Sequence, residues 1–285
     1  MRIIPDENKR AIELLNEGNI SKSLRNDLCI LGKYYKDNFG NNKEKIKKFL
    51  EHFCEWRIIN YNKVLYFDII KSATNYSFRH KLFVAKPVEI IDSELEKINN
   101  IKDGNKNEDR EKNLKKMLFT ILVLSKLYNQ KIESSIQNKK ISENKKEKLK
   151  KTKYFFRESF GEICRLSNIN ANMKIREELL IDLYKKELVY VSNNATYKPL
   201  IIEENYNKEN VKMEITTFKS LGLQYLKHIK ENGIITCKKC GEMIIQKSPK
   251  QKYCPQCAKE IHKQIDREYQ REKYSRRYSK KKNLD

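Results

Sequence analysis

Apolar residues in the first third of the chain recur every three or four positions, which is the spacing of one face of an α-helix. Polar caps and glycines divide this pattern into helical segments at about 6–17, 21–40, 43–56 and from 62 onward. Ser21 is the expected N-cap of the second segment, and Val64, Ile69 and Ala73 are expected to point inward from the fourth. We therefore predict a helical module over residues 1–100.

Part of this module carries a more specific pattern. It comprises Arg25-Asn26-Asp27-Leu28, Leu31, Tyr34, Ile46, Phe49, Leu50, Phe53, Val64, Ile69 and Ser72-Ala73. Over about residues 21–75, these positions resemble the small helical domain found after the catalytic domain of many phage and plasmid primases. The resemblance implies a replication or mobile-element context. No primase catalytic domain precedes the match, so we do not expect polymerase activity.

A long helix is expected next, from about Glu111 to Glu133. Its centre, Met117–Leu124, is apolar on all sides except for one threonine, and such a helix should be buried centrally. The following stretch, residues 138–153, holds eight lysines and two glutamates. We predict that this stretch is an exposed helix or a flexible basic linker.

The elements beyond Ser159 follow the order of a winged helix. A short helix over 160–166 precedes a polar turn and a longer helix that ends near Leu188. Two strands, 189–191 and 196–202, then flank an Asn-Asn turn and predict a hairpin. We expect a winged-helix-like α+β centre within residues 101–232.

The exposed face of the longer helix mixes both signs of charge. Lys174 and Arg176 are its candidate nucleic-acid contacts. Two more cations, Lys185 and Lys186, share the helix with four carboxylates, Glu177, Glu178, Asp182 and Glu187. Carboxylates beside phosphates weaken binding, so two interpretations stay open: entry into a DNA groove, and packing or dimerisation without DNA contact.

Four cysteines near the C-terminus form two CxxC pairs, which are Cys237 with Cys240 and Cys254 with Cys257. Each pair bends the chain so that two thiolates converge, and two pairs complete a tetrahedral S4 site. We expect one structural zinc ion in a ribbon over residues 233–258. Its short strands are expected at Ile234–Ile235, Met243–Ile245 and Tyr253. A redox CxxC and an iron–sulfur cluster are the alternatives, but the redox motif usually lies near a βαβ unit, which is missing here.

The other candidate reactive residues indicate ordinary structural roles. Cys29, Cys54 and Cys164 each lie in an apolar helical pattern, so buried thiols are expected. His262 follows Cys257 by five residues and is a candidate fifth ligand or nuclease histidine. Four thiolates leave no open position for an activated water, so we expect a solvated helix residue instead.

Charge adds a class of partner to this picture. The 285-residue chain has a formal net charge of +23, and two segments, 101–155 and 237–285, hold 18 of these charges. Residues 156–236 are nearly neutral, with 12 basic and 11 acidic side chains. A basic excess favours polyanions such as nucleic acid, whereas the abundance of lysine over arginine also fits an AT-rich coding bias. No GxGxxG or GxxxxGK[ST] string is present, which excludes typical dinucleotide enzymes and P-loop ATPases.

The last segment interleaves basic and aromatic residues and predicts a basic tail helix over 259–285. Its candidate nucleic-acid contacts are Arg267, Tyr269, Arg271, Lys273, Tyr274, Arg276, Arg277, Lys280, Lys281 and Lys282. Arginine forks suit phosphates and tyrosine rings can stack on exposed bases. The alternative is a solvated tail that only keeps the protein in solution. From about Thr236 to Lys282 the arrangement resembles zinc ribbons at the C-termini of phage and mobile-element proteins.

The sequence therefore predicts a mostly α protein that is cytoplasmic, since it has no signal-peptide core and no apolar stretch long enough to span a membrane. The leading hypothesis is a non-enzymatic nucleic-acid-binding protein of a phage or mobile element that acts in replication, with DNA favoured over RNA. A second hypothesis is an adaptor that binds a host polymerase, replisome or transcription component. A nuclease or primase-like enzyme is a third, against which we find no clustered catalytic carboxylates.

Overall fold

We describe a computed structural model of the protein, which covers residues 4–104, 107–136, 143–204 and 206–282. Helices make up 59% of the structure, which confirms the mostly helical class. The chain divides into two compact units, each built from segments that are distant in sequence. Unit 1 contains residues 1–92, 121–158 and 189–216, and unit 2 contains residues 93–120, 159–188 and 217–285.

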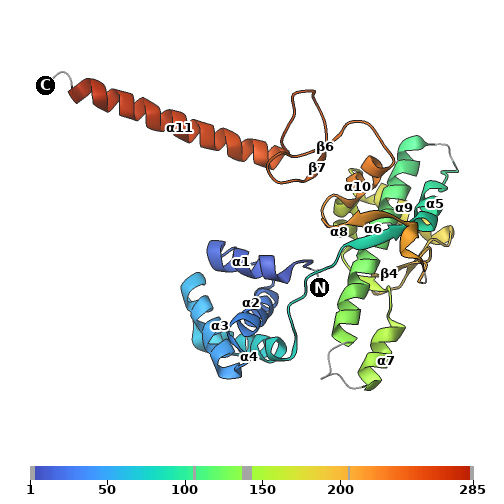
Figure 1. The fold of residues 1–285 in the computed structure, drawn as a ribbon, viewed down its shortest axis with the longest axis horizontal. Helices are drawn as coiled ribbons and strands as arrows, with labels where there is room; N and C mark the ends of the chain where they lie inside the picture. The colour runs from blue at the N-terminus through green and yellow to red at the C-terminus, as the bar shows by residue number, and fades with distance from the viewer. Residues whose placement is uncertain (1–3, 105–106, 137–142, 205, 283–285) are drawn as a thin grey trace. The chain divides into compact units, whose positions relative to one another are not determined.

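Unit 1 contains four N-terminal helices, two small sheets and parts of the central helices (Figure 1). Its elements are α1 Glu7–Glu17, α2 Leu24–Phe39, α3 Lys43–Arg57, α4 Lys63–Arg79, β1 Val88–Ile91, α7 Glu143–Lys151, β2 Phe156–Arg157, β3 Val189–Val191, β4 Thr196–Pro199, the 3-10 turn η1 Lys208–Asn210 and β5 Val211–Ile215. The helix α6, Glu108–Ile136, contributes residues 121–136 to this unit and its earlier residues to unit 2.

Unit 2 contains helices around the first half of α6, together with a small hairpin and a long C-terminal helix. Its further elements are α5 Asp92–Asn99, α8 Phe160–Leu166, α9 Met173–Lys185, α10 Leu221–His228, β6 Ile234–Thr236, β7 Met243–Ile245 and α11 Pro255–Lys282. Figure 1 shows α11 as one continuous helix.

The N-terminal module folds because its helices have defined ends and one apolar face each. Asp6 caps α1 by accepting a hydrogen bond from the Lys9 N–H, and Gly18 ends the helix in the left-handed conformation. Asn62 caps α4 in the same way as Asp6. The four helices enclose a shared core that includes Leu14, Leu28, Leu31, Ile46, Leu50, Phe53, Ile70 and Ala73. The four predicted helices are therefore confirmed.

Two details of this module differ from the sequence predictions. The second helix begins after Ser23, not Ser21, whose backbone N–H is instead held by the Asp27 carboxylate at 2.5 Å. Val64, expected to face inward, is 82% exposed. The buried row of α4 is Ile70, Ala73, Thr74 and Ser77, which follows the spacing of a helix face, and Val64 lies off that row.

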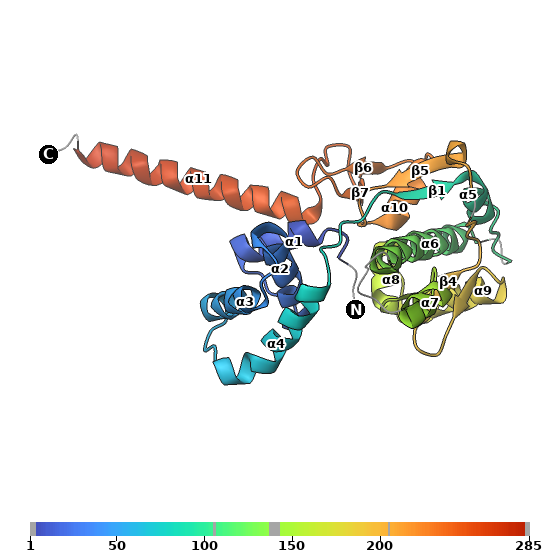
Figure 2. The same ribbon diagram turned by 60° about the horizontal axis from the view of Figure 1, so that its bottom comes forward.

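The two sheets of unit 1 combine one hairpin that the sequence predicts with strand pairs that no local pattern connects. Strands β1 and β5 pair antiparallel, with Val88 opposite Ile215, although more than a hundred residues separate them (Figure 2). The predicted hairpin is present as β3 and β4, and the strand β2, which we did not predict, adds to it in the order β2-β4-β3. The hairpin's second strand ends at Pro199, so residues 200–202 are outside it.

The middle of the helix α6 is buried. Every residue from Met117 to Leu124 is at most 5% exposed, as the pattern without a polar face predicts. Thr120 satisfies its hydroxyl by donating to the Lys116 carbonyl one turn earlier. The basic stretch predicted at 138–153 contains the helix α7, whereas residues 138–142 lie outside the described residues. Within the described residues, no helix combines the length and the apolar character that a membrane crossing needs.

Candidate metal centre and nucleic-acid interface

The hairpin of β6 and β7 positions the first CxxC pair. Ile235 pairs with Ile244, and the chain turns between the strands at Cys237–Gly241. The Cys237 N–H donates to the Glu242 carbonyl at 2.8 Å, and the Gly241 N–H donates to the Cys237 carbonyl at 2.9 Å. Gly241 has a φ of 72°, which a residue with a side chain rarely adopts. The sequence CKKCG therefore forms a tight turn that points both sulfur atoms to one side.

The second pair lies at the start of α11 rather than in a strand. Cys254 precedes the helix and Cys257 is in its first turn, where the Cys257 N–H donates to the Cys254 sulfur at 3.4 Å. Lys238 N–H donates to the Lys252 carbonyl at 3.0 Å and joins the two turns. Tyr253, predicted to be part of a strand, has no strand partner and instead packs against the cysteines.

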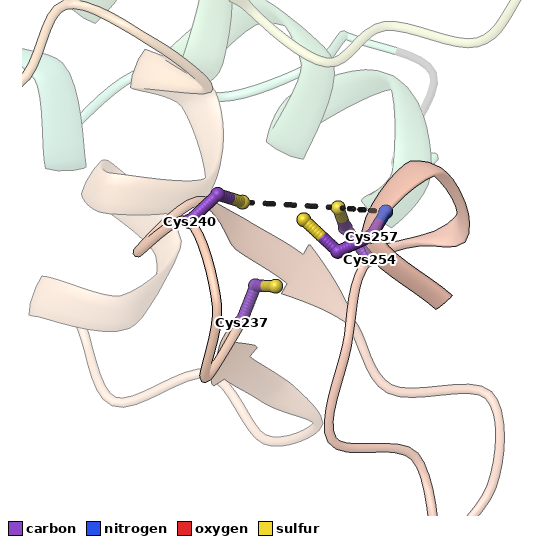
Figure 3. A group of neighbouring side chains, drawn as sticks. All are labelled: Cys237, Cys240, Cys254 and Cys257. Carbon is purple, nitrogen blue, oxygen red and sulfur yellow. Dashed lines mark hydrogen bonds between the residues drawn. The ribbon is translucent and has the colours of Figure 1, made fainter. Parts of the chain in front are cut away.

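The four thiols meet with the geometry of a metal centre (Figure 3). Their sulfur atoms all lie within 4.8 Å of one another, and Cys240 Sγ is 3.8 Å from Cys254 Sγ. A tetrahedron with metal–sulfur bonds of about 2.3 Å has sulfur–sulfur edges of about 3.8 Å. Three of the cysteines are buried and Cys240 is exposed. The four residues predicted as ligands are thus brought together and can hold one metal ion.

The surroundings of Cys237 favour a thiolate. Burial alone would raise its pKa, but backbone N–H groups of Cys240, Cys254 and Lys239 lower the pKa to about 6. Burial and the neighbouring thiols raise the pKa of Cys257. A divalent metal would offset the mutual repulsion of the four thiolates. The Lys239 ammonium, 2.9 Å from the Glu260 carboxylate, adds a link between the first turn and α11.

Only part of the predicted nucleic-acid surface on α11 lies in the region where side chains are described. Arg267, Tyr269 and Arg271 are exposed, and Tyr269 has 62% of its surface free. The side chains of Lys273, Tyr274, Arg276, Arg277, Lys280, Lys281 and Lys282 lie outside the described residues, although their backbone is helical. Lys263, Arg267 and Arg271 follow one another at four-residue steps and so form one basic row, spaced about 6 Å apart.

An interaction that the sequence did not predict changes the interpretation of α9. Arg110, near the start of α6, pairs with two of its carboxylates, Glu178 at 3.5 Å and Asp182 through a hydrogen bond. It also pairs with Asp103 at 3.2 Å, and the hydrogen bond to Asp182 raises the pKa of the arginine. One guanidinium offsets only one of the three negative charges that it contacts, so this face of α9 is less acidic than the sequence suggests but is not neutral. No local pattern could reveal a pair 72 residues apart.

The two predicted contacts on α9 differ in environment. Lys174 is exposed, whereas Arg176 is half-buried and lines a cleft.

Cys29, Cys54 and Cys164, the three cysteines predicted to be buried thiols, are confirmed as such. Burial raises the pKa of Cys54 to about 12 and that of Cys164 to about 11. His262 is exposed on α11, in agreement with a solvated residue.

No family model matches the chain, and neither a curated protein nor a solved structure shows significant similarity to it. The functional argument therefore depends on the chain's own residues.

Proposed function

We propose that this chain is a non-enzymatic nucleic-acid-binding protein of a phage or mobile element that acts in DNA replication. The observation that carries the proposal is the exposed basic row of α11, Lys263, Arg267 and Arg271, which starts six residues beyond Cys257 of the four-cysteine centre. Such a row suits contacts to phosphates, which supply most of the affinity in binding without sequence preference. The primase-domain resemblance of residues 21–75 supports the replication context.

The metal in this proposal is one structural zinc ion. Four thiolates form a closed coordination shell that leaves no position for substrate or an activated water. The role of the metal is then to fix the ribbon and the first turn of α11. This fits a binding protein better than a metal-dependent nuclease.

Residues 108–199 support a winged-helix assignment. Their elements follow the order α6, α7, β2, α8, α9, β3 and β4, and the three strands pair in the order β2-β4-β3. In this motif the second helix of the helix–turn–helix, here α9, is the one that reads DNA. The pairing of Arg110 with Glu178 and Asp182 reduces the negative charge on α9, which favours this role, and the exposed Lys174 can meet a phosphate.

Neutralising the basic row tests the proposal. The triple variant Lys263→Gln, Arg267→Gln, Arg271→Gln should bind duplex DNA on the order of tenfold to a hundredfold more weakly at low salt. Its log–log salt dependence should be shallower by roughly 2 to 3, because each lost phosphate contact releases one counterion fewer. Fluorescence anisotropy with a labelled duplex over a salt series measures both quantities.

A matched control removes three charges elsewhere. Lys43, Lys45 and Lys48 are exposed on α3, and their change to glutamine alters the net charge by the same amount. We expect this control to keep nearly the full salt dependence. If both triple variants lost the same affinity for duplex DNA, net charge alone would account for the attraction. If the unmodified protein did not bind DNA, the proposal would be refuted.

A second candidate function, an adaptor for a replication or transcription protein, is favoured by one observation. Large apolar side chains at the end of α3 and the start of α4 are exposed: Trp56 71%, Ile59 90%, Val64 82% and Leu65 75%. We call these four residues the apolar patch. Contiguous exposed apolar surface is typical of protein interaction sites.

The adaptor function predicts that Trp56→Ser combined with Leu65→Ser abolishes binding to a purified replisome or polymerase component, measured by calorimetry. Both side chains are exposed, so the double variant should fold normally. DNA binding should be unchanged, because the patch carries no part of the α11 basic row. Retained protein binding in the double variant would contradict a role of the apolar patch.

A further inference from the structure

A cleft in unit 2 lies between the turn that joins α8 to α9 and the cysteine ribbon. Its volume is about 810 Å³, within the range of small-ligand sites. The turn contributes Asn168 and Ile169, α9 contributes Arg176, and the ribbon contributes Met243 and Lys247. Its charged lining residues are the cations Arg176 and Lys247, the carboxylate Glu242, and Arg165, whose guanidinium is already paired with the Glu162 carboxylate at 2.7 Å. The cleft is therefore a concave, basic site between two parts of the chain that we associate with nucleic acid.

Two buried polar atoms of the cleft lining have no hydrogen-bond partner. They are Nε of Arg176 and Oδ1 of Asn168, both shielded from solvent. A buried polar group without a hydrogen-bond partner lowers the stability of the folded protein by about 1–3 kcal/mol. Such a group therefore calls for an explanation, and a bound ligand is one. Both side chains line the same cleft, so a ligand that enters it could pair with these two atoms once the side chains turn toward it.

The turn that carries Asn168 is rigidly held. The Asn168 N–H donates to the Arg165 carbonyl at 3.1 Å, and the Ile169 N–H donates to the Cys164 carbonyl at 3.1 Å. The Lys116 ammonium donates to the Asn168 carbonyl, also at 3.1 Å. Asn168 adopts a φ of 54°, a conformation that asparagine tolerates better than most residues. The backbone groups are thus occupied, while Oδ1 of the Asn168 side chain accepts no hydrogen bond.

We infer that this cleft binds one unpaired nucleotide of a nucleic-acid strand. The guanidinium of Arg176 and the ammonium of Lys247 suit its phosphates, since arginine offers a planar fork to phosphate oxygens. The Asn168 amide, which can both donate and accept, suits a base edge, and Ile169 and Met243 provide apolar surface for the face of the base. A paired base is stacked inside a duplex and cannot enter a recess of this kind.

This inference rests on the proposed function, and it adds a preference for unpaired strands that the α11 row does not provide.

In the full-length protein, Arg176→Gln and Asn168→Gly should each weaken binding of a short labelled oligodeoxythymidine about tenfold. Binding of a blunt duplex should change by no more than about twofold, since α11 contacts phosphates in either form. Glycine tolerates the φ of Asn168, so the second variant preserves the turn. Fluorescence anisotropy measures both affinities.

Lys43→Gln is the control for the loss of one positive charge, because Lys43 is exposed on α3 and belongs neither to the cleft lining nor to the α11 basic row. We expect it to leave the ratio of single-strand to duplex affinity unchanged. An unchanged ratio in both Arg176→Gln and Asn168→Gly would overturn the inference while leaving the proposed function intact. If the unmodified protein bound neither nucleic acid, the proposed function would fail and the inference with it.

A crosslinking measurement on the unmodified protein does not depend on the folding of any variant. An oligodeoxythymidine with one 4-thiothymidine at its end should crosslink to the peptide that contains Met243 and Lys247. Crosslinks confined to α11 would overturn the inference.

Discussion

Changing Cys237 or Cys254 to serine will release the metal and unfold residues 233–257. The reason is the composition of this segment's interior. Its buried core consists of Cys237, Cys254 and Cys257, with only Ile244 and Tyr253 packed against them. A segment this small cannot bury enough apolar surface to fold without a metal or a disulfide. In zinc-finger peptides, metal binding supplies about 10–16 kcal/mol of apparent folding free energy.

Elemental analysis should find one zinc per chain in the unmodified protein and none in either variant. Limited proteolysis should cut both variants within the loop of residues 246–252, because the turns that hold this loop depend on the metal. The helical content of α1–α4 should persist, since the cysteine core is separate from the α1–α4 core. Circular dichroism would then show only a small loss of signal.

Cys164→Ala provides the control for thiol loss. Cys164 is fully buried in α8 but is not one of the four clustered cysteines. This variant should keep one zinc per chain and lose about 1 kcal/mol or less of stability, in line with removal of one small apolar group. Full zinc retention in both Cys237→Ser and Cys254→Ser would refute the metal site.

The features predictable from the sequence are those encoded by neighbouring residues. Caps and apolar spacing predicted the bounds of α1 and α3 and the start of α4, and the CxxC spacing located the metal centre. The apolar run without a polar face identified the buried part of α6. Each of these signals operates within one helix or one turn, where the geometry of the chain leaves few alternatives.

The features that could not be predicted depend on contacts between distant segments. The β1–β5 pairing and the Arg110–Asp182 hydrogen bond join residues with no shared local pattern. Val64 was misplaced because apolar character alone was taken as burial, although its position lies outside the row of Ile70 and Ala73. The cleft of Asn168 and Arg176 belongs to the same class, since a cavity exists only once both walls are in place.

Removing the carboxylate of Glu7 will destabilise the N-terminal module by about 3–5 kcal/mol. Glu7 and Lys33 form an ion pair in which each residue is only 3% exposed. Glu7 also accepts a hydrogen bond from the Phe83 N–H at 2.7 Å and lies 3.6 Å from the Lys131 ammonium. Glu7→Ala would leave the Lys33 charge buried without its partner. Urea unfolding, followed by hydrogen exchange of peptides from α2, measures the loss.

The pH dependence and two further variants identify the buried charge as the cause. Burial already lowers the pKa of Lys33 from its ordinary value of 10.5, and loss of Glu7 should lower it further. The unfolded chain then binds one proton more than the folded chain, so the stability of Glu7→Ala should rise as the pH approaches 10.5.

Glu44 is an exposed glutamate in the first turn of α3, and Glu44→Ala should lower the stability by less than about 0.5 kcal/mol. The double variant Glu7→Leu, Lys33→Met should recover most of the loss, because a buried ion pair replaced by apolar side chains of similar volume is often neutral. The explanation by a buried, unpaired Lys33 charge would be contradicted if the loss of stability in Glu7→Ala did not depend on pH and was not recovered in the double variant.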